Sequence, residues 1–175
     1  MDKLLTPDAS RKMVNIYGKM RDWSADCLDL SVCHGVCCTD SATSTYIEFA
    51  YMIDFLAHNN VPESKIRDML SKQRERQEFF ALDGSIHRRC QFFSENGDGC
   101  LVYSARPYVC RSYRRYANDG KYGLCKPIEI AEAVDEIKFV RQLARLNRSV
   151  VPKGHKGEWE LIEKDIEFWA EQVLG

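Results

Sequence analysis

The sequence predicts a mainly α-helical protein, in which a helical domain encloses an irregular cysteine-rich loop region with at most a short β-hairpin. Apolar residues recur at helical spacing towards both ends of the chain. All eight cysteines lie between residues 27 and 125, and turn-forming stretches such as "SENGDG" and "ANDGKYG" occur in the same region. We therefore expect a single domain over residues 1–175, with the cysteine-bearing region 27–125 flanked by helical segments.

The first helix is expected to begin at Pro7. Thr6 is a suitable N-cap, proline fits the first helical position, and Asp8 then lies at the positive end of the helix dipole. An apolar stripe at helical spacing follows, formed by Met13, Ile16, Tyr17 and Met20.

Two more helices are expected between residues 44 and 82. One covers about residues 44–58 and ends at "HNN". Its stripe is formed by Tyr46, Phe49, Ala50, Ile53 and Ala57. The other starts after Pro62 and runs through "ESKIRDMLSKQRERQEFFAL", with Ile66, Met69 and Leu70 facing inward. Its charged run "KQRERQE" is typical of a solvated face.

Residues 83–126 have a different character, and the helical pattern returns only after them. "CLVYS" is the best candidate strand, with "HRRCQFF" as its expected partner. From Pro127 a long stripe is formed by Ile130, Val134, Ile137, Val140 and Ala144, until "SVVPKGHKG" interrupts it. A last helix carries on one face Trp159, Ile162, Ile166, Trp169 and Val173.

The composition indicates an ordinary globular protein of the cytoplasm. Hydrophobic residues make up 45% and charged residues 29% of the 175 residues, enough to form a core without cross-links. The formal net charge of -1 gives no global signal for nucleic acid or for a membrane surface. No stretch approaches the roughly 20 apolar residues of a membrane span, and the N-terminus lacks a secretory apolar region. In the reducing cytoplasm, clustered cysteines indicate metal or redox chemistry rather than disulfides.

The spacing of the cysteines favours an iron–sulfur cluster modestly over zinc. Cys33, Cys37 and Cys38 belong to the stretch "CHGVCC". After 51 intervening residues, Cys90-x9-Cys100-x9-Cys110 follows, with Cys125 beyond. The chain has no CxxC pair, which structural zinc sites and thioredoxin-like redox sites usually contain. Iron–sulfur clusters accept thiolates from separated loops at irregular spacings.

The adjacent pair Cys37–Cys38 raises a separate question. Consecutive side chains diverge, so one small ion does not readily use both sulfurs. Either the site holds several metals, or one of the two thiols is not a primary ligand. Cys27, and a histidine such as His34 or His87, stay open as alternative ligands.

Basic residues surround the last part of the cysteine pattern. In "CLVYSARPYVCRSYRRY", Arg106 and Arg111 flank Cys110, where guanidinium groups would stabilise thiolates. We expect Tyr103, Arg106 and Arg111 to surround the ligands and tune them, and Pro107 to fix the loop between Cys100 and Cys110. The same tract is alternatively a basic surface strip that binds an anionic partner.

The stretch from Cys33 to Tyr113 resembles a known family. "CLVYSARPYVCRSY" is similar to the motif Cys-x-(Ile/Val)-Tyr-x-x-Arg-Pro-x-x-Cys-Arg-x-(Tyr/Phe) of the CxxCxxCC, or YkgJ-like, family, described as a putative zinc- or iron-chelating domain. "CQFF" at Cys90 resembles the Cys-x-Phe-Leu step of that family. "CHGVCC" resembles its first motif, although that motif commonly reads C-x2-C-x2-C-C, with one more cysteine. Flagellin lysine N-methylases carry a similar cysteine set.

Three functions follow as expectations. The first is a protein with an iron–sulfur cluster, used in redox chemistry or in modification of another protein, with ligands Cys33, Cys37, Cys38, Cys90, Cys100, Cys110 and Cys125. The second is a zinc protein with a structural or metal-carrying role. The third is a metal-scaffolded module for an anionic partner. A protein substrate or redox partner is compatible with the first, whereas nucleic acid and membrane are not expected partners. Since hydrolase and nucleotide-binding motifs are missing, whether the protein is an enzyme stays open.

Overall fold

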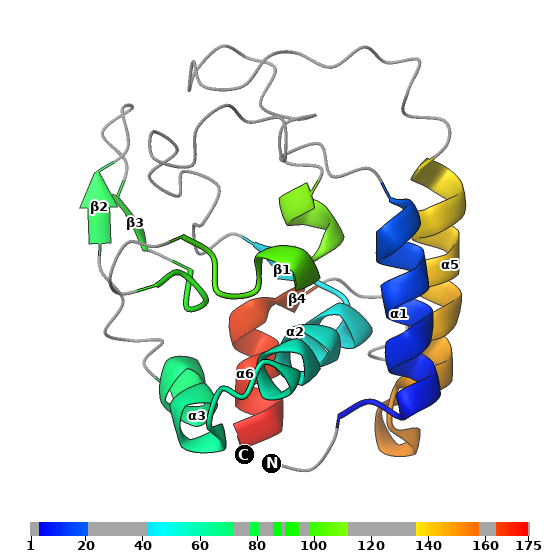
Figure 1. The fold of residues 1–175 in the computed structure, drawn as a ribbon, viewed down its shortest axis with the longest axis horizontal. Coiled ribbons are helices and arrows are strands. Elements are labelled where there is room, and N and C mark those ends of the chain that lie inside the picture. Colours follow the sequence, from blue (N-terminus) through cyan, green and yellow to red (C-terminus); the bar gives the residue numbers. More distant parts are fainter. Residues whose placement is uncertain are drawn as a thin grey trace.

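The computed structural model is mainly helical, as the sequence predicts (Figure 1). It describes residues 4–20, 42–71, 78–80, 86–88, 90–94, 99–111, 136–157 and 164–174. The predicted positions Ile130, Val134, Trp159 and Ile162 lie outside these ranges. In the described ranges, no helix has the length and apolar character needed to cross a bilayer.

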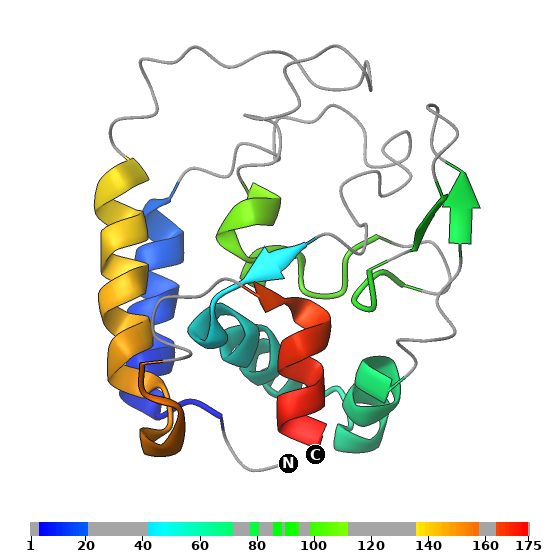
Figure 2. The ribbon, with the colours of Figure 1, turned by 180° about the vertical axis from the view of Figure 1, so that it is seen from behind.

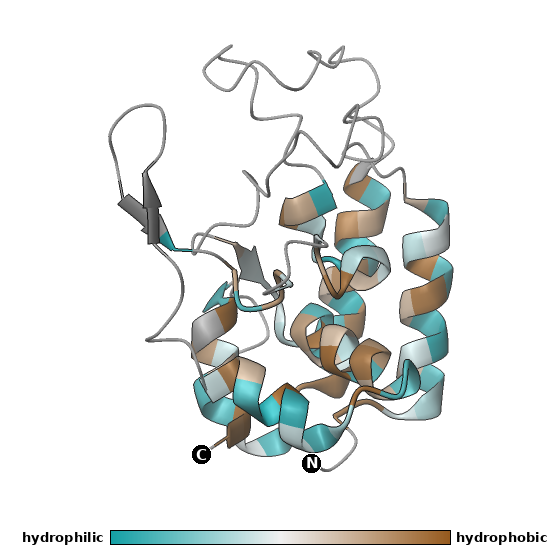
Figure 3. Cartoon of the chain, turned by 60° about the vertical axis from the view of Figure 1, so that its left-hand side comes forward, coloured by the Kyte–Doolittle hydropathy of each residue, from teal (hydrophilic) through white to brown (hydrophobic). Residues whose placement is uncertain are grey.

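Helix α2 (Tyr46–His58) is the centre of the fold. Ten of its thirteen residues are buried, among them Phe49, Ala50 and Met52 at 0% exposure. Helices α1 (Pro7–Lys19) and α5 (Glu136–Val150) pack together on one side of it, and α3 (Glu63–Ser71) and α6 (Ile166–Leu174) pack together on the other (Figure 1). Hydrophobic and hydrophilic residues alternate along the surrounding helices, as expected for amphipathic elements (Figure 3). The predicted α2 stripe is buried except for Ala57, which is exposed.

Helix α1 begins where the sequence predicts. Thr6 is the N-cap, and its hydroxyl oxygen accepts a hydrogen bond of 3.2 Å from the N–H of Ala9. The predicted stripe Met13, Ile16, Tyr17 and Met20 is buried. The Ser10 hydroxyl donates to the carboxylate of Asp54 at 2.6 Å, which joins α1 to α2.

Two segments that are far apart in the sequence meet just before the N-terminus of α2. Strand β1 (Thr43–Ser44) pairs antiparallel with β4 (Lys164–Asp165), a pairing that the sequence analysis did not predict (Figure 2). The indole N–H of Trp169 donates to the carbonyl of Ser44 at 2.8 Å. On the other side, the buried Asn147 of α5 accepts from the N–H of Ile47 at 2.9 Å.

The end of α3 and the position of the hairpin differ from prediction. Helix α3 ends at Ser71, and "EFF" forms strand β2 (Glu78–Phe80), which pairs with β3 (Ile86–Arg88). The hairpin therefore lies before "CLVYS". Within the described part of "CLVYS", Cys100 alone takes part in β-pairing, through an isolated backbone β-bridge to Phe93. β-Propensity of the aromatic pair Phe79–Phe80 outweighs the preceding helical pattern.

The inward face of α5 was predicted wrongly. Ile137 and Val140 are 53% and 40% exposed, while Phe139, Leu143 and Leu146 are buried. The second set has the same helical spacing and larger side chains, so burying it removes more apolar area from water. The interruption at "SVVPKGHKG" is confirmed, since α5 ends at Val150 and a single turn, η4 (Lys153–His155), follows.

Candidate metal centre

Three predicted ligands, Cys90, Cys100 and Cys110, lie in described segments that pack against the helical core. All three are half-buried thiols. The N–H of Phe93 donates to the carbonyl of Cys90 at 2.9 Å, and the N–H of Leu101 donates to that of Phe92 at 2.8 Å. Together with the Phe93–Cys100 bridge, these bonds fasten the backbone after Cys90 to the backbone around Cys100.

The turn between these two segments depends on a glycine. Gly99 has φ of +97°, a conformation that residues with a side chain rarely adopt. Its carbonyl accepts from the N–H of Ser94 at 2.9 Å. This local geometry explains why "NGDGC" can return the chain from the Cys90 segment to Cys100.

A short helical path connects Cys100 to Cys110. The N–H of Tyr103 donates to the carbonyl of Cys100 at 3.1 Å, and the single turn η2 (Tyr103–Ala105) follows. Pro107 is fully buried, and its carbonyl accepts from the N–H groups of Cys110 and Arg111 at 3.0 and 3.2 Å. Pro107 therefore opens the helical turn that carries Cys110, as its missing N–H and fixed φ favour.

Arg106 and Arg111 brace this path from inside. Their exposed fractions are only 5% and 6%. Arg106 donates to the carbonyl of Tyr103 at 2.8 Å and stacks on that ring, with 3.5 Å from Cζ to the centroid. Arg111 donates to the carbonyls of Arg106, at 3.0 Å, and of Ser104.

The burial of both arginines corrects one interpretation of the basic tract. Arg106 and Arg111 are not part of an exposed strip for an anionic partner, because their guanidinium groups are used in the loop itself. Arg114 and Arg115 lie outside the described residues. The expected effect of Arg106, Arg111 and Tyr103 on thiolate ligands stays a prediction.

Glu48 ties the Cys110 turn to the helical core, and the sequence analysis missed it. This carboxylate is 2% exposed and accepts from the N–H of Tyr108 at 2.7 Å and from the hydroxyl of Tyr17 at 3.2 Å. Its other oxygen accepts from the N–H and hydroxyl of Thr45, at 2.9 and 2.8 Å. The available signal was its place three residues after the N-cap Thr45, the position of the acid in a capping box.

Tyr17 lies between the core and the Cys110 turn. The guanidinium carbon of Arg111 is 4.3 Å from the centroid of its ring. Burial raises the pKa of Tyr17 well above its usual range, and the nearby Glu48 carboxylate raises it further. Arg111 acts in the opposite direction on this pKa, whereas Cys110 adds a smaller upward contribution.

Gln91, directly after Cys90, is an orphaned buried amide. Its side chain is 8% exposed, and neither its Nε2 nor its Oε1 has a hydrogen-bond partner among the described residues. Buried side-chain amides are rarely left unsatisfied, because losing water without a replacement partner is costly. An unpaired buried amide in the residue next to a candidate ligand fits a site in which a bound group supplies the partner.

The remaining predicted ligands cannot be placed with these three. Cys27, Cys33, Cys37, Cys38 and Cys125 lie outside the described residues, as does His34. In the described ranges alone, no group of three or more histidines, cysteines or acids is arranged to hold a metal ion. The donors that are placed are sulfurs, which suit zinc or iron–sulfur ligation and not hard cations such as Mg²⁺.

Comparison with known proteins identifies the family. The profile of the CxxCxxCC family, described as "Putative zinc- or iron-chelating domain", matches residues 26–138, a range that contains all eight cysteines. The chain belongs to the CxxCxxCC family. The description of CxxCxxCC proteins indicates metal binding through cysteine, in agreement with the thiols described above. No match was found among curated proteins or among solved structures.

Proposed function

We propose that this chain is one metal-binding domain that carries an iron–sulfur cluster, with thiolate ligands drawn from Cys33, Cys37, Cys38, Cys90, Cys100, Cys110 and Cys125. The observation that carries the proposal is the braced loop 99–111, which holds Cys100 and Cys110 half-buried at its two ends. Iron–sulfur clusters accept thiolates from separate loops, and the chain lacks the CxxC pair usual in structural zinc sites.

The environment of the loop supports an anionic thiolate site. Two buried guanidinium groups, of Arg106 and Arg111, lie within the loop and lower the cost of thiolate charge. The orphaned amide of Gln91, the residue after Cys90, offers a buried N–H donor to a bound group, and hydrogen bonds to sulfur tune iron–sulfur potentials.

The function proposed for the cluster is redox chemistry or modification of another protein in the cytoplasm. Both roles need a protein partner or substrate. Because the described thiols are half-buried rather than fully enclosed, the group that they hold lies near enough to the surface for exchange with such a partner.

Anaerobic purification followed by iron, zinc and acid-labile sulfide analysis tests the cluster. We expect a brown protein with visible absorption and iron and sulfide in comparable amounts. Stoichiometric zinc without sulfide would overturn the cluster and leave the zinc alternative, since the family description names zinc as well as iron. Air-purified material is a poorer sample, since clusters are lost in air and zinc can replace them.

Serine substitution of each cysteine then identifies the ligands. Cys90→Ser, Cys100→Ser and Cys110→Ser are each expected to lower bound metal at least severalfold. Cys37→Ser and Cys38→Ser, compared side by side, show which of the adjacent thiols ligates, and Cys27→Ser shows whether that thiol takes part. Unchanged metal content in all three of the first variants would contradict the assignment.

A further inference from the structure

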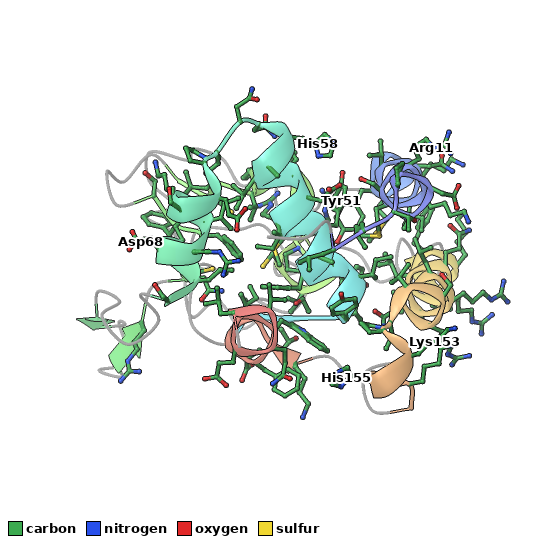
Figure 4. All side chains as sticks on the ribbon, turned by 90° about the horizontal axis from the view of Figure 1, so that it is seen from below. Arg11, Tyr51, His58, Asp68, Lys153 and His155 are labelled. Atoms are coloured by element: carbon green, nitrogen blue, oxygen red, sulfur yellow. The ribbon has the colours of Figure 1, made fainter. Side chains whose placement is uncertain are left out.

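One face of α5 carries a row of exposed basic side chains, which we name the α5 basic stripe: Lys138, Arg141, Arg145 and Arg148. At 3.6 residues per turn, these positions fall within an arc of about 80° and span about 15 Å along the helix axis. Seen along the helices, nitrogen-tipped side chains of α5 project away from α2, on the same side of the molecule as the labelled Arg11 and Lys153 (Figure 4).

Three members of the stripe have no counter-charge within the described part of the chain. Arg141, Arg145 and Arg148 form neither an ion pair nor a hydrogen bond there. Some exposed cations of other helices are paired: Lys12 lies 2.7 Å from Asp8, and Arg67 lies 2.9 Å from Glu63. The sequence of α5 contains a single acidic residue, Glu136, which lies in the first turn of the helix.

The stripe is therefore costly to the isolated helix. Like charges three and four residues apart repel each other and destabilise a helix. The fold gains nothing visible in return from Arg141, Arg145 or Arg148, since their side chains are exposed and make no contact that braces the core. A local feature that costs stability without a structural return is typical of a binding surface.

Exposed aliphatic side chains accompany the cations. Ile137 and Val140 of α5 are 53% and 40% exposed, and Val14 of the adjacent helix α1 is 57% exposed. These are three of the four large hydrophobic residues that are exposed in the described chain. The α1–α5 face thus combines guanidinium groups with apolar surface that is not used in the core.

We propose that the α5 basic stripe is a docking site for an acidic amphipathic helix of another protein. Its length of about 15 Å equals about three helical turns, over which carboxylates at i, i+3 or i+4, and i+7 of a partner can meet the stripe. Arginine predominates over lysine, as at protein interfaces, where the guanidinium binds carboxylate through two parallel hydrogen bonds. Ile137 and Val140 would cover the apolar edge of the partner.

Charge and burial make other polyanions poorer occupants. The main apolar face of α5 is buried in the core through Phe139, Leu143 and Leu146, and the exposed Ile137 and Val140 alone are too little apolar surface to insert the helix into a membrane. The net charge of the whole chain is -1, which gives no long-range attraction to nucleic acid. This inference does not depend on which metal the cysteines bind.

Peptide binding by the full metal-loaded chain tests the docking site. The probe is a synthetic helical peptide of about three to four turns, with glutamates at i, i+4 and i+7 beside a leucine row. A scrambled peptide of the same composition, a 20-base-pair RNA duplex and phosphatidylserine vesicles are measured in parallel. The variant is Arg141→Ala/Arg145→Ala/Arg148→Ala, and the control removes three exposed cations elsewhere: Lys65→Ala/Arg67→Ala/Lys156→Ala.

We expect the helical peptide to bind the wild type and the control variant with equal affinity. Its affinity for the α5 variant should be about tenfold lower, because a few exposed ion pairs are lost. Its affinity should also fall as salt rises. Equal affinity of the α5 variant and the control would overturn the proposal, as would absence of peptide binding. Tighter stripe-dependent binding of RNA or vesicles would overturn the class of partner, and stripe-dependent self-association would replace it by a second copy of the chain.

Discussion

The carboxylate of Glu48 and the backbone N–H of Tyr108 form a hydrogen bond of 2.7 Å across 60 residues of sequence. This bond fastens the turn that carries Cys110 to the first turn of the central helix. The same carboxylate accepts from Tyr17 and from Thr45. The position of a candidate metal ligand is thus set by a buried acid that belongs to the helical core.

Glu48→Gln is expected to destabilise the protein by about 1–3 kcal/mol, because an amide in place of the carboxylate leaves at least one buried donor without an acceptor. Urea unfolding of the metal-free protein measures the change. Glu63→Gln is the matched control, since Glu63 is exposed and its bond to Arg67 lies on the surface, and it should change stability by less than about 0.5 kcal/mol. Equal losses in the two variants would contradict the role of Glu48.

Arg111→Lys keeps the charge but is expected to cost about 1–3 kcal/mol, because an ammonium group cannot donate in the fork geometry to the carbonyls of Arg106 and Ser104. Arg67→Lys, at an exposed site, should be nearly neutral. If metal content falls in Arg111→Lys while Cys110 stays intact, the brace also positions the ligand. A neutral effect at Arg111 would show that the loop holds without it.

Alkaline pH is expected to destabilise the wild type through Tyr17. Its pKa is raised in the folded state, so above the unfolded value of about 10 the unfolded chain loses this proton while the folded chain retains it. The contribution of Tyr17 to the free energy of unfolding is therefore fully present below about pH 10 and is lost as the pH rises further. Tyr17→Phe should lose stability at pH 8, through the missing bond to Glu48, but decline less steeply from pH 9.5 to 11.

Absorbance at 295 nm checks this assignment directly, because it follows phenol ionisation. Burial also raises the pKa values of Tyr46 and Tyr51, so a part of the late-ionising signal should persist in Tyr17→Phe. A variant with the same late phase as the wild type would show that Tyr17 titrates normally.

If the proposed cluster is correct, Gln91→Leu is expected to affect the metal-free and the metal-loaded protein differently. Without metal, leucine should leave stability unchanged or raise it, since it removes an unpaired buried amide. With metal, competition by a chelator should become easier by severalfold, because a hydrogen bond near Cys90 is lost. Gln142→Leu on the exposed face of α5 is the control. Equal chelator sensitivity of Gln91→Leu and the wild type would remove Gln91 from the site.

Local signals predicted the start of α1 and the buried faces of α1 and α2 well. Thr6 and Pro7 act through bonds within one turn, which the sequence shows directly. The prediction of the buried face of α5 failed because the helix has two apolar stripes with the same helical spacing. Only packing against α1 and α2 selects Phe139, Leu143 and Leu146 over Ile137 and Val140. The β1–β4 pairing joins residues more than a hundred positions apart and leaves no local signal.

The candidate site shows the same division. The motif around "RPYVC" predicts thiol ligands with Arg106 and Arg111 around them, and those roles stay predictions; it does not show that the two arginines are buried in the loop. Glu48 and Tyr17 come from other helices, so no pattern near the cysteines could include them. Gln91 looks like an ordinary polar loop residue until its burial is known.

The nearly complete burial of α2 implies that this helix and the loop 99–111 differ in how readily they open. The amides of α2 are shielded by four other helices, so they should exchange with solvent only when the whole domain unfolds. The loop 99–111 packs on the core through Val102 and Ala105, but its backbone is held by isolated turns and not by a long helix, so we expect its amides to exchange earlier than those of α2. If the proposed site is correct, metal would then enter and leave through local opening of this loop while α2 stays folded.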